Sequence, residues 1–151
     1  MKRMLMLPVL LIAGLALAGS PAASLEQLLG QYFMIQKSLA ADSVKDVSQS
    51  AAGIVKIGRE AAAADSGAKA QLAAISEAAA KLNNADLKTA RKEFGTLSDR
   101  VIAYLKASGA KRNPPYQFYC PMVKKSWLQP DKQTRNPYYG SSMLTCGEIV
   151  Q

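Results

Sequence analysis

The sequence contains no histidine, and its only cysteines, Cys120 and Cys146, lie near the C-terminus. The absence of histidine excludes a Ser-His-Asp or Cys-His catalytic arrangement, and two cysteines alone cannot complete the usual four-ligand zinc site. The sequence also lacks a Cys-x-x-Cys redox motif and a glycine-rich phosphate loop. No pair of acidic residues stands in an apolar setting suited to acid–base catalysis. We therefore predict that the protein is not an enzyme.

No apolar run reaches the roughly 20 residues that a membrane-spanning helix needs. The longest run, residues 5–18, follows two basic residues and ends in small residues, which is typical of a secretory signal peptide. We predict a signal peptide at residues 1–23, cleaved after Ala18 or Ala22. Residues 24–151 then form a single periplasmic domain with no stable membrane insertion. An uncleaved leader that holds the protein at the membrane is the alternative.

Acidic residues are few, 11 against 19 basic ones, and the net charge is +8. Without the leader, most of the basic excess lies in residues 110–151. A basic surface attracts nucleic acid, anionic lipid or an acidic protein. Because export argues against nucleic acid, the remaining interpretations are a solvated basic loop and a surface that meets anionic lipid or an acidic protein partner.

The apolar residues between Leu25 and Lys106 repeat with helical spacing. The four predicted helices span residues 25–39, 43–61, 66–82 and 87–108. For the second helix we predict a capping box formed by Ser43 and Asp46. Short loops between amphipathic helices favour an all-α, up-down-up-down four-helix bundle.

The composition changes after Gly109, because six of the ten aromatic residues and five of the seven prolines lie beyond it. Dense proline excludes long helices, and the aromatic side chains carry too much apolar area for a free tail. We predict that residues 110–151 form an irregular lobe packed on the bundle, with a turn at residues 136–140.

The two cysteines each have a methionine nearby. Cys120 and Met122 flank Pro121, which favours extended backbone, so we expect their side chains to point the same way. Met143 and Cys146 are spaced to lie on one face of a helical turn. The four sulfurs would form a soft ligand set of the kind that selects Cu(I).

A disulfide is the alternative interpretation of the two cysteines. Exported proteins commonly carry disulfides, and closing a loop of about 25 residues between Cys120 and Cys146 contributes on the order of 3 kcal/mol. The two interpretations are compatible if the thiols alternate between a bonded and a metal-bound form. We expect Lys124 and Lys125 to lower the pKa of Cys120. Trp127 is either a packing anchor or an aromatic face against a bound cation.

Four segments resemble a known family: "YCPM", the Trp127-Leu128 pair, "NPYYG" and "MLTCGE", preceded by the helical "ARKEFGTLSDRVI". In this order and spacing they resemble a bacterial domain family of unknown function found in periplasmic proteins. Its members occur alone and fused to the periplasmic adaptor subunits of copper/silver efflux pumps. This chain lacks the hairpin and barrel segments of an adaptor, so the resemblance implies a stand-alone module.

The resemblance implies a helical bundle capped by the motif-bearing lobe, and a link to copper. The positions that match the sulfur residues of the family are Cys120, Met122, Met143 and Cys146. The positions that match its framework residues are Trp127, Asn136, Pro137, Tyr138, Gly140, Gly147 and Glu148.

We therefore predict a periplasmic binding protein for Cu(I) or Ag(I) in heavy-metal handling or efflux support. Its expected partner is a heavy-metal efflux adaptor or another envelope protein. The alternative is an interaction module closed by a Cys120–Cys146 disulfide, without metal.

Overall fold

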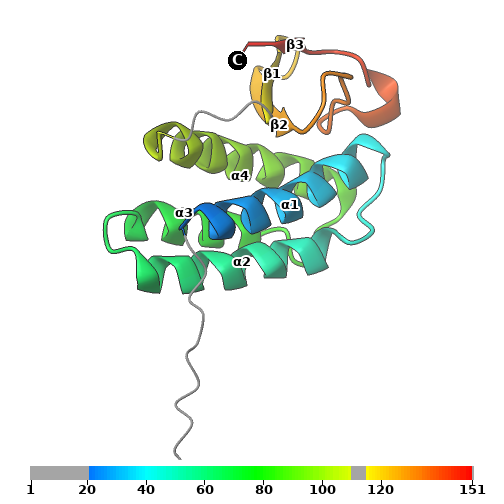
Figure 1. The fold of residues 1–151 in the computed structure, drawn as a ribbon. Helices are drawn as coiled ribbons and strands as arrows, with labels where there is room; N and C mark the ends of the chain where they lie inside the picture. The colour runs from blue at the N-terminus through cyan, green and yellow to red at the C-terminus, as the bar shows by residue number, and fades with distance from the viewer. Residues whose placement is uncertain (1–20, 110–114, 151) are drawn as a thin grey trace, which may run out of the picture.

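The computed structural model describes residues 21–109 and 115–150, and Figure 1 shows a helical part below a smaller C-terminal lobe. The helices are α1 (Pro21–Ala40), α2 (Val47–Ala64), α3 (Lys69–Ala80) and α4 (Leu87–Ala107). The lobe contains β1 (Tyr116–Cys120), β2 (Lys125–Gln129), the short 3-10 helix η1 (Gly140–Ser142) and β3 (Glu148–Ile149). The predicted signal peptide lies outside the described residues except for residues 21–23, which begin α1, and it stays a prediction.

The four predicted helices are confirmed. Each buries the apolar stripe seen in the sequence, and short loops (41–46, 65–68 and 81–86) join helices that pack against their neighbours in the chain. Among α2, α3 and α4, only α4 begins with a side-chain cap: Asp86 accepts a hydrogen bond of 2.8 Å from the backbone N–H of Thr89. Within the described residues, none of the helices combines the length and apolar character needed to cross a membrane.

The predicted capping box before α2 is wrong. Ser43 accepts a hydrogen bond from the nearby N–H of Lys45 instead, at 3.0 Å. Asp46 takes a left-handed conformation with φ 63°, and its side chain caps nothing. A residue in this conformation cannot continue a helix, so the chain turns and α2 begins at Val47.

The all-α prediction is also wrong, because the lobe contains a three-stranded antiparallel sheet in the order β2-β1-β3. Phe118 of β1 lies opposite Trp127 of β2 and also opposite Ile149 of β3. Aromatic pairs across strands stabilise such a sheet, and the β1–β2 turn at residues 121–124 includes Lys124 with φ 52°. The sequence analysis missed this hairpin because the dense prolines suggested irregular structure, whereas β1 begins directly after Pro115.

The lobe shares its core with the bundle. A continuous chain of aromatic contacts runs from α1 into the sheet, with ring-centroid distances of 5.0 to 6.0 Å. Its members, in order, are Tyr32, Phe94, Tyr138, Trp127 and Phe118. The buried hydroxyl of Tyr32 also accepts the N–H of Leu128 in β2 at 3.1 Å and lies 2.7 Å from Ser98 Oγ in α4. The lobe is therefore fixed on the face formed by α1 and α4.

A polar clamp holds the predicted turn at residues 136–140 on the bundle. Arg91 of α4 donates to the carbonyl of Pro137 at 3.0 Å and pairs with Asp42 at 2.6 Å. Asp42 in turn accepts the N–H of Ser141 at 2.9 Å. Gly140 has φ 56°, and a Cβ there would collide with Asp42 and Arg91. Only glycine fits this turn without displacing the clamp.

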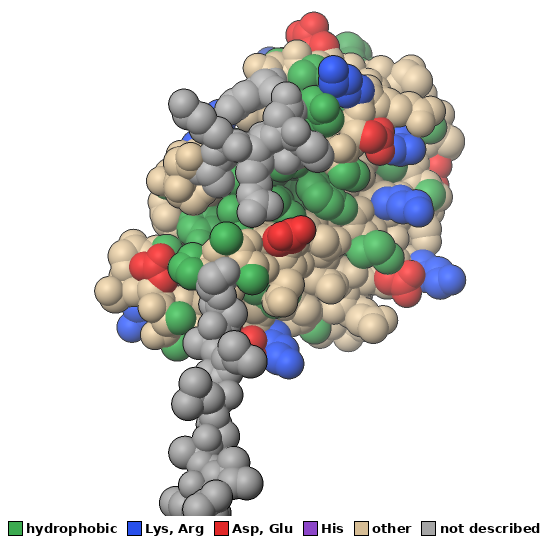
Figure 2. All heavy atoms as spheres, in the orientation of Figure 1, with side chains coloured by type: hydrophobic (Ala, Val, Ile, Leu, Met, Phe, Trp, Pro, Cys, Tyr) green, Lys and Arg blue, Asp and Glu red, His purple; other side chains and the backbone are tan. Residues whose placement is uncertain are grey.

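Charges of both signs are interspersed on the face shown in Figure 2, with apolar side chains between them. In the described part of the lobe, two basic residues are paired: Lys125 with Asp99 at 3.0 Å, and Arg135 with Asp131. Lys124 and Lys132 are exposed. The predicted basic surface of the lobe is thus partly neutralised within the described residues.

Candidate functional site

The two cysteines meet at one place in the lobe. Cys120 is the last residue of β1 and is 0% exposed, whereas Cys146 lies half-buried in the loop that leads into β3. The two thiols lie close enough for each to shift the pKa of the other, and neither is in a disulfide. The structure thus brings the two cysteines together, and a metal site or a disulfide at this pair stays a prediction.

The surroundings of the two cysteines shift the pKa values of their thiols in opposite directions. Burial raises the pKa of Cys120, but hydrogen bonds from Cys146, from the backbone N–H groups of Val123 and Met122 and from the side chain of Asn136 lower it below its ordinary value. The pKa of Cys146 is raised, first by its hydrogen bond to Cys120 and then by burial.

The prediction that Lys124 and Lys125 lower the pKa of Cys120 is wrong. Lys125 extends to α4, where its ammonium pairs with Asp99. Lys124 is exposed at the left-handed position of the β1–β2 turn. The groups that lower the pKa of Cys120 are instead hydrogen-bond donors, and two of them are backbone N–H groups that the sequence does not reveal.

The two methionines lie on the turns that flank the thiols. The prediction that the chain is extended from Cys120 to Met122 is wrong. The chain turns directly after Cys120, and Met122 is 64% exposed. Met143 is half-buried, and the N–H of Cys146 donates to its carbonyl at 3.0 Å. The segment from Met143 to Cys146 is thus a single turn that follows η1.

Trp127 acts as a packing anchor for the Cys146 loop. Its indole is 0% exposed, stacks on Phe118 at 5.3 Å and donates its N–H to Gln129 at 3.0 Å. Gly147, which follows Cys146, has φ 151°, and a Cβ there would collide with the indole. Of the other predicted framework residues, Asn136, Pro137, Tyr138 and Gly140 are buried and Glu148 is exposed in β3.

Within residues 21–109 and 115–150, no three side chains among Cys, Asp and Glu are grouped closely enough to hold a metal ion. Thiolate and thioether groups suit Cu(I) and other soft ions, whereas Mg²⁺ and Ca²⁺ need several oxygen ligands.

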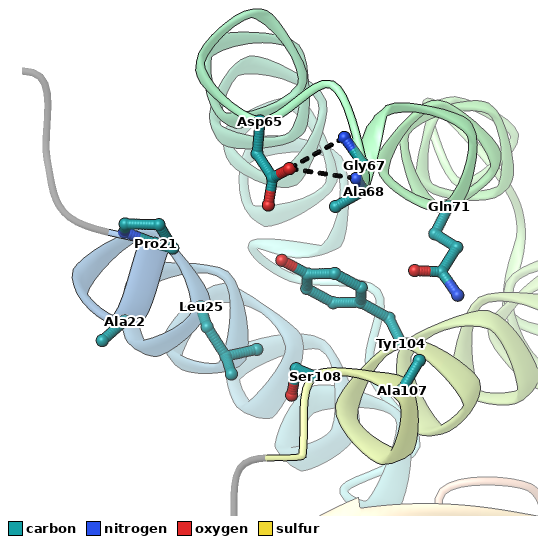
Figure 3. A pocket seen from close by; sticks show the side chains of 10 residues that line it. All are labelled: Pro21, Ala22, Leu25, Asp65, Gly67, Ala68, Gln71, Tyr104, Ala107 and Ser108. Carbon is teal, nitrogen blue, oxygen red and sulfur yellow. Dashed lines mark hydrogen bonds between the residues drawn. The ribbon is translucent and has the colours of Figure 1, made fainter.

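A pocket of about 420 Å³ lies at the end of the bundle where α1 begins and α4 ends, and the sequence analysis did not anticipate it. Figure 3 shows the Tyr104 hydroxyl directed into it, toward the α2–α3 loop. Asp65 of that loop accepts the N–H groups of Gly67 at 2.9 Å and Ala68 at 3.2 Å, which delays the start of α3 to Lys69. Burial and the charge of Asp65 raise the pKa of Tyr104.

Comparison with known proteins gives a match for the bundle. No curated protein and no solved structure matches the chain. A family profile described as "Protein of unknown function (DUF3347)" matches residues 28–113, which is more than half of the chain. The matched residues contain nearly all of the four helices, and the lobe with both cysteines follows them. The chain therefore belongs to the DUF3347 family of proteins of unknown function.

Proposed function

We propose that this protein is a small exported, periplasmic binding protein that holds Cu(I) or Ag(I) at the Cys120–Cys146 pair and serves heavy-metal handling or efflux. The observation that carries the proposal is the contact between the two thiols, one of which is surrounded by donors that favour its thiolate. Thiolate is the form that binds a metal.

The donor groups around Cys120 match the needs of a soft monovalent ion. Two thiolates provide ligands to Cu(I), and hydrogen bonds to a thiolate sulfur offset the charge that remains on it. Met143 and Met122 add thioether sulfurs from the two flanking turns. A set made only of sulfur favours Cu(I) and Ag(I) over harder ions.

The gradient of exposure supports a role in passing the ion on. Cys120 is fully buried, Cys146 and Met143 are half-buried, and Met122 is 64% exposed. Lys124, exposed in the same turn as Met122, provides a positive charge for an acidic partner, such as a heavy-metal efflux adaptor or another envelope protein.

The test is an anaerobic competition titration of the reduced protein with Cu(I) against a chelator of known affinity. We expect one equivalent to bind with a sub-nanomolar Kd, which corresponds to roughly 12 kcal/mol or more. Cys120→Ser and Cys146→Ser should each abolish the competition, and the double variant Met122→Leu, Met143→Leu should weaken it.

The matched control is Met34→Leu, because Met34 is an exposed methionine on α1, outside the lobe. It should bind Cu(I) like the unmodified protein. If the unmodified protein does not compete with the chelator, the proposal is wrong. If the double variant keeps full affinity, the methionines are not ligands.

A second candidate function is a disulfide-closed interaction module without metal. The contact between the thiols favours it too, because oxidation would need only a local movement. The lobe also exposes four of the six large apolar side chains found exposed in the described residues, which suits the docking of a protein. The four are Met122, Leu144, Ile149 and Val150. In this case Cys120→Ser lowers the thermal stability of the oxidised protein whether or not copper is present, and equal stability would contradict the bridge.

A further inference from the structure

Asn136 is a fully buried polar residue that contacts both cysteine-bearing segments. Its Nδ2 donates to the carbonyl of Cys146 at 2.8 Å, and its own backbone N–H donates to the carbonyl of Leu144, also at 2.8 Å. The Asn136 side chain also lies close enough to Cys120 to lower the pKa of its thiol. Asn136 thus lies between the end of β1 and the turn that carries Cys146.

The remaining atoms of Asn136 fix its orientation. Its Oδ1 accepts the N–H of Tyr138 at 2.8 Å, and its backbone carbonyl accepts the N–H of Gly140 at 3.1 Å. Because Oδ1 is engaged by a donor, Nδ2 must face the cysteines. The clamp formed by Arg91 and Asp42 holds this turn on α4, so Asn136 is anchored to the bundle.

Few other hydrogen bonds tie the Cys146 turn to the rest of the lobe. The bond from Cys146 N–H to Met143 lies within the turn itself. Among the described residues, the bond from Thr134 Oγ1 to the carbonyl of Gly147 is long, at 3.4 Å. The two short bonds from Asn136 therefore provide the main polar connection, and the contact of Gly147 with Trp127 adds the apolar one.

We propose that Asn136 is the positioning residue of the sulfur site, which holds the Cys146 turn against Cys120 and so sets the distance between the two sulfurs. For Cu(I) this inference rests on the proposed function, but the approach of the two thiols is testable without copper. An Asn136→Asp substitution keeps the size of the side chain and replaces the Nδ2 donor by an oxygen. That oxygen would face the Cys146 carbonyl and the Cys120 sulfur and repel both.

Gln129 provides a matched control, because it is the other fully buried amide of the lobe. Its Nε2 donates to the carbonyls of Asp131 at 3.0 Å and Gln133 at 2.6 Å, and its Oε1 accepts from Trp127. None of its hydrogen bonds reaches a cysteine. Gln129→Glu therefore removes the same number of side-chain donors from the same lobe without a direct effect on the sulfurs.

The experiment measures the binding of phenylarsine oxide to the reduced full-length protein. Two thiols displace the arsenic-bound oxygen, two As–S bonds form, and one water leaves, so the reagent binds tightly only where two sulfurs are held close together. We expect one equivalent to bind the unmodified protein and the Gln129→Glu variant with equal affinity. We expect Asn136→Asp to bind about tenfold more weakly, because the hydrogen bonds that hold the two segments together are lost. A Cys146→Ser variant defines the level for a single thiol.

Thermal denaturation separates positioning from simple loss of stability. Both amide variants should lower the Tm, but only Asn136→Asp should lower the affinity for the arsenical. Equal affinity of the two variants, or single-thiol binding by the unmodified protein, would overturn the inference. Tight arsenical binding without Cu(I) binding would refute the proposed function and leave the positioning role of Asn136 in place.

Discussion

The bundle and the C-terminal lobe reach their stability in different ways. In the bundle, leucine, isoleucine and alanine side chains on four stripes fill a core, and a buried hydroxyl such as that of Ser76 bonds within its own helix, to Leu72 at 2.9 Å. In the lobe, the buried amides of Gln129 and Asn136 each join segments that are irregular. A bundle of this kind tolerates changes that conserve apolar volume, whereas the lobe depends on particular residues.

The family match and the two cysteines lie in different regions of the molecule. The family profile matches residues 28–113, so it covers most of the bundle, while the paired thiols lie beyond it. The lobe packs on the face formed by α1 and α4, where the side chains of Arg91 and Tyr32 hydrogen-bond to it. Sites held on a rigid scaffold by specific hydrogen bonds are a common arrangement for binding.

The largest expected effect comes from Trp127→Ala, which removes the centre of the lobe. Deleting a fully buried tryptophan costs about 3–5 kcal/mol. We expect the buried Cys120 to become reactive toward a thiol reagent at urea concentrations where circular dichroism still reports intact helices. If thiol exposure and loss of helix coincide, the bundle and the lobe form one cooperative unit and the comparison fails.

A smaller loss is expected for Gly147→Ala. The residue has φ 151° and lies against the Trp127 indole, so a methyl group there is strained and overpacked by about 2–3 kcal/mol. Urea unfolding followed by tryptophan fluorescence should show a lower midpoint. An unchanged midpoint would mean that the Cys146 loop moves freely away from Trp127.

The stabilising effect of the clamp formed by Arg91 and Asp42 should depend on pH. Hydrogen bonds from Ser141 and then from Arg91 lower the pKa of Asp42 to about 2, below the ordinary 3.8. The stabilisation is therefore complete above about pH 4 and is lost as the pH falls toward 2. Asp42→Asn should remove this part of the acid dependence of the Tm. If the Tm falls equally in both proteins as the pH is lowered from 4 to 2, Asp42 does not hold the lobe on the bundle.

The smallest effect is expected in the bundle, for Gly30→Ala. Gly30 is exposed within α1, and a Cβ there meets no atom within 4 Å. Alanine should therefore raise the free energy of unfolding by about 0.5–1 kcal/mol. A glycine of the bundle and a glycine of the lobe thus respond with opposite signs, and destabilisation by Gly30→Ala in urea unfolding would erase that contrast.

The sequence predicted the helices well because each one buries a stripe with a regular period, such as Leu28, Ile35 and Leu39 in α1. It failed at the start of α2, where left-handed aspartates decide the turn, and in the lobe, where the pairing of Phe118 with Trp127 decides the sheet. Neither feature has a period. The four sulfurs were recognised as residue types, but Met122 proved largely exposed because a turn replaces the expected extended segment.

The sequence by itself determined that the protein has four amphipathic helices, an aromatic lobe that must pack on them, and two cysteines and two methionines in that lobe. Local spacing and composition carry that information. Only the tertiary structure decided that Cys120 is buried beside Cys146 and that Asn136 lies between their segments. It also decided that Cys146 and then backbone N–H groups, rather than lysines, lower the pKa of Cys120. These features depend on residues far apart in the chain meeting on one face of the bundle, and no local pattern in the sequence records such a meeting.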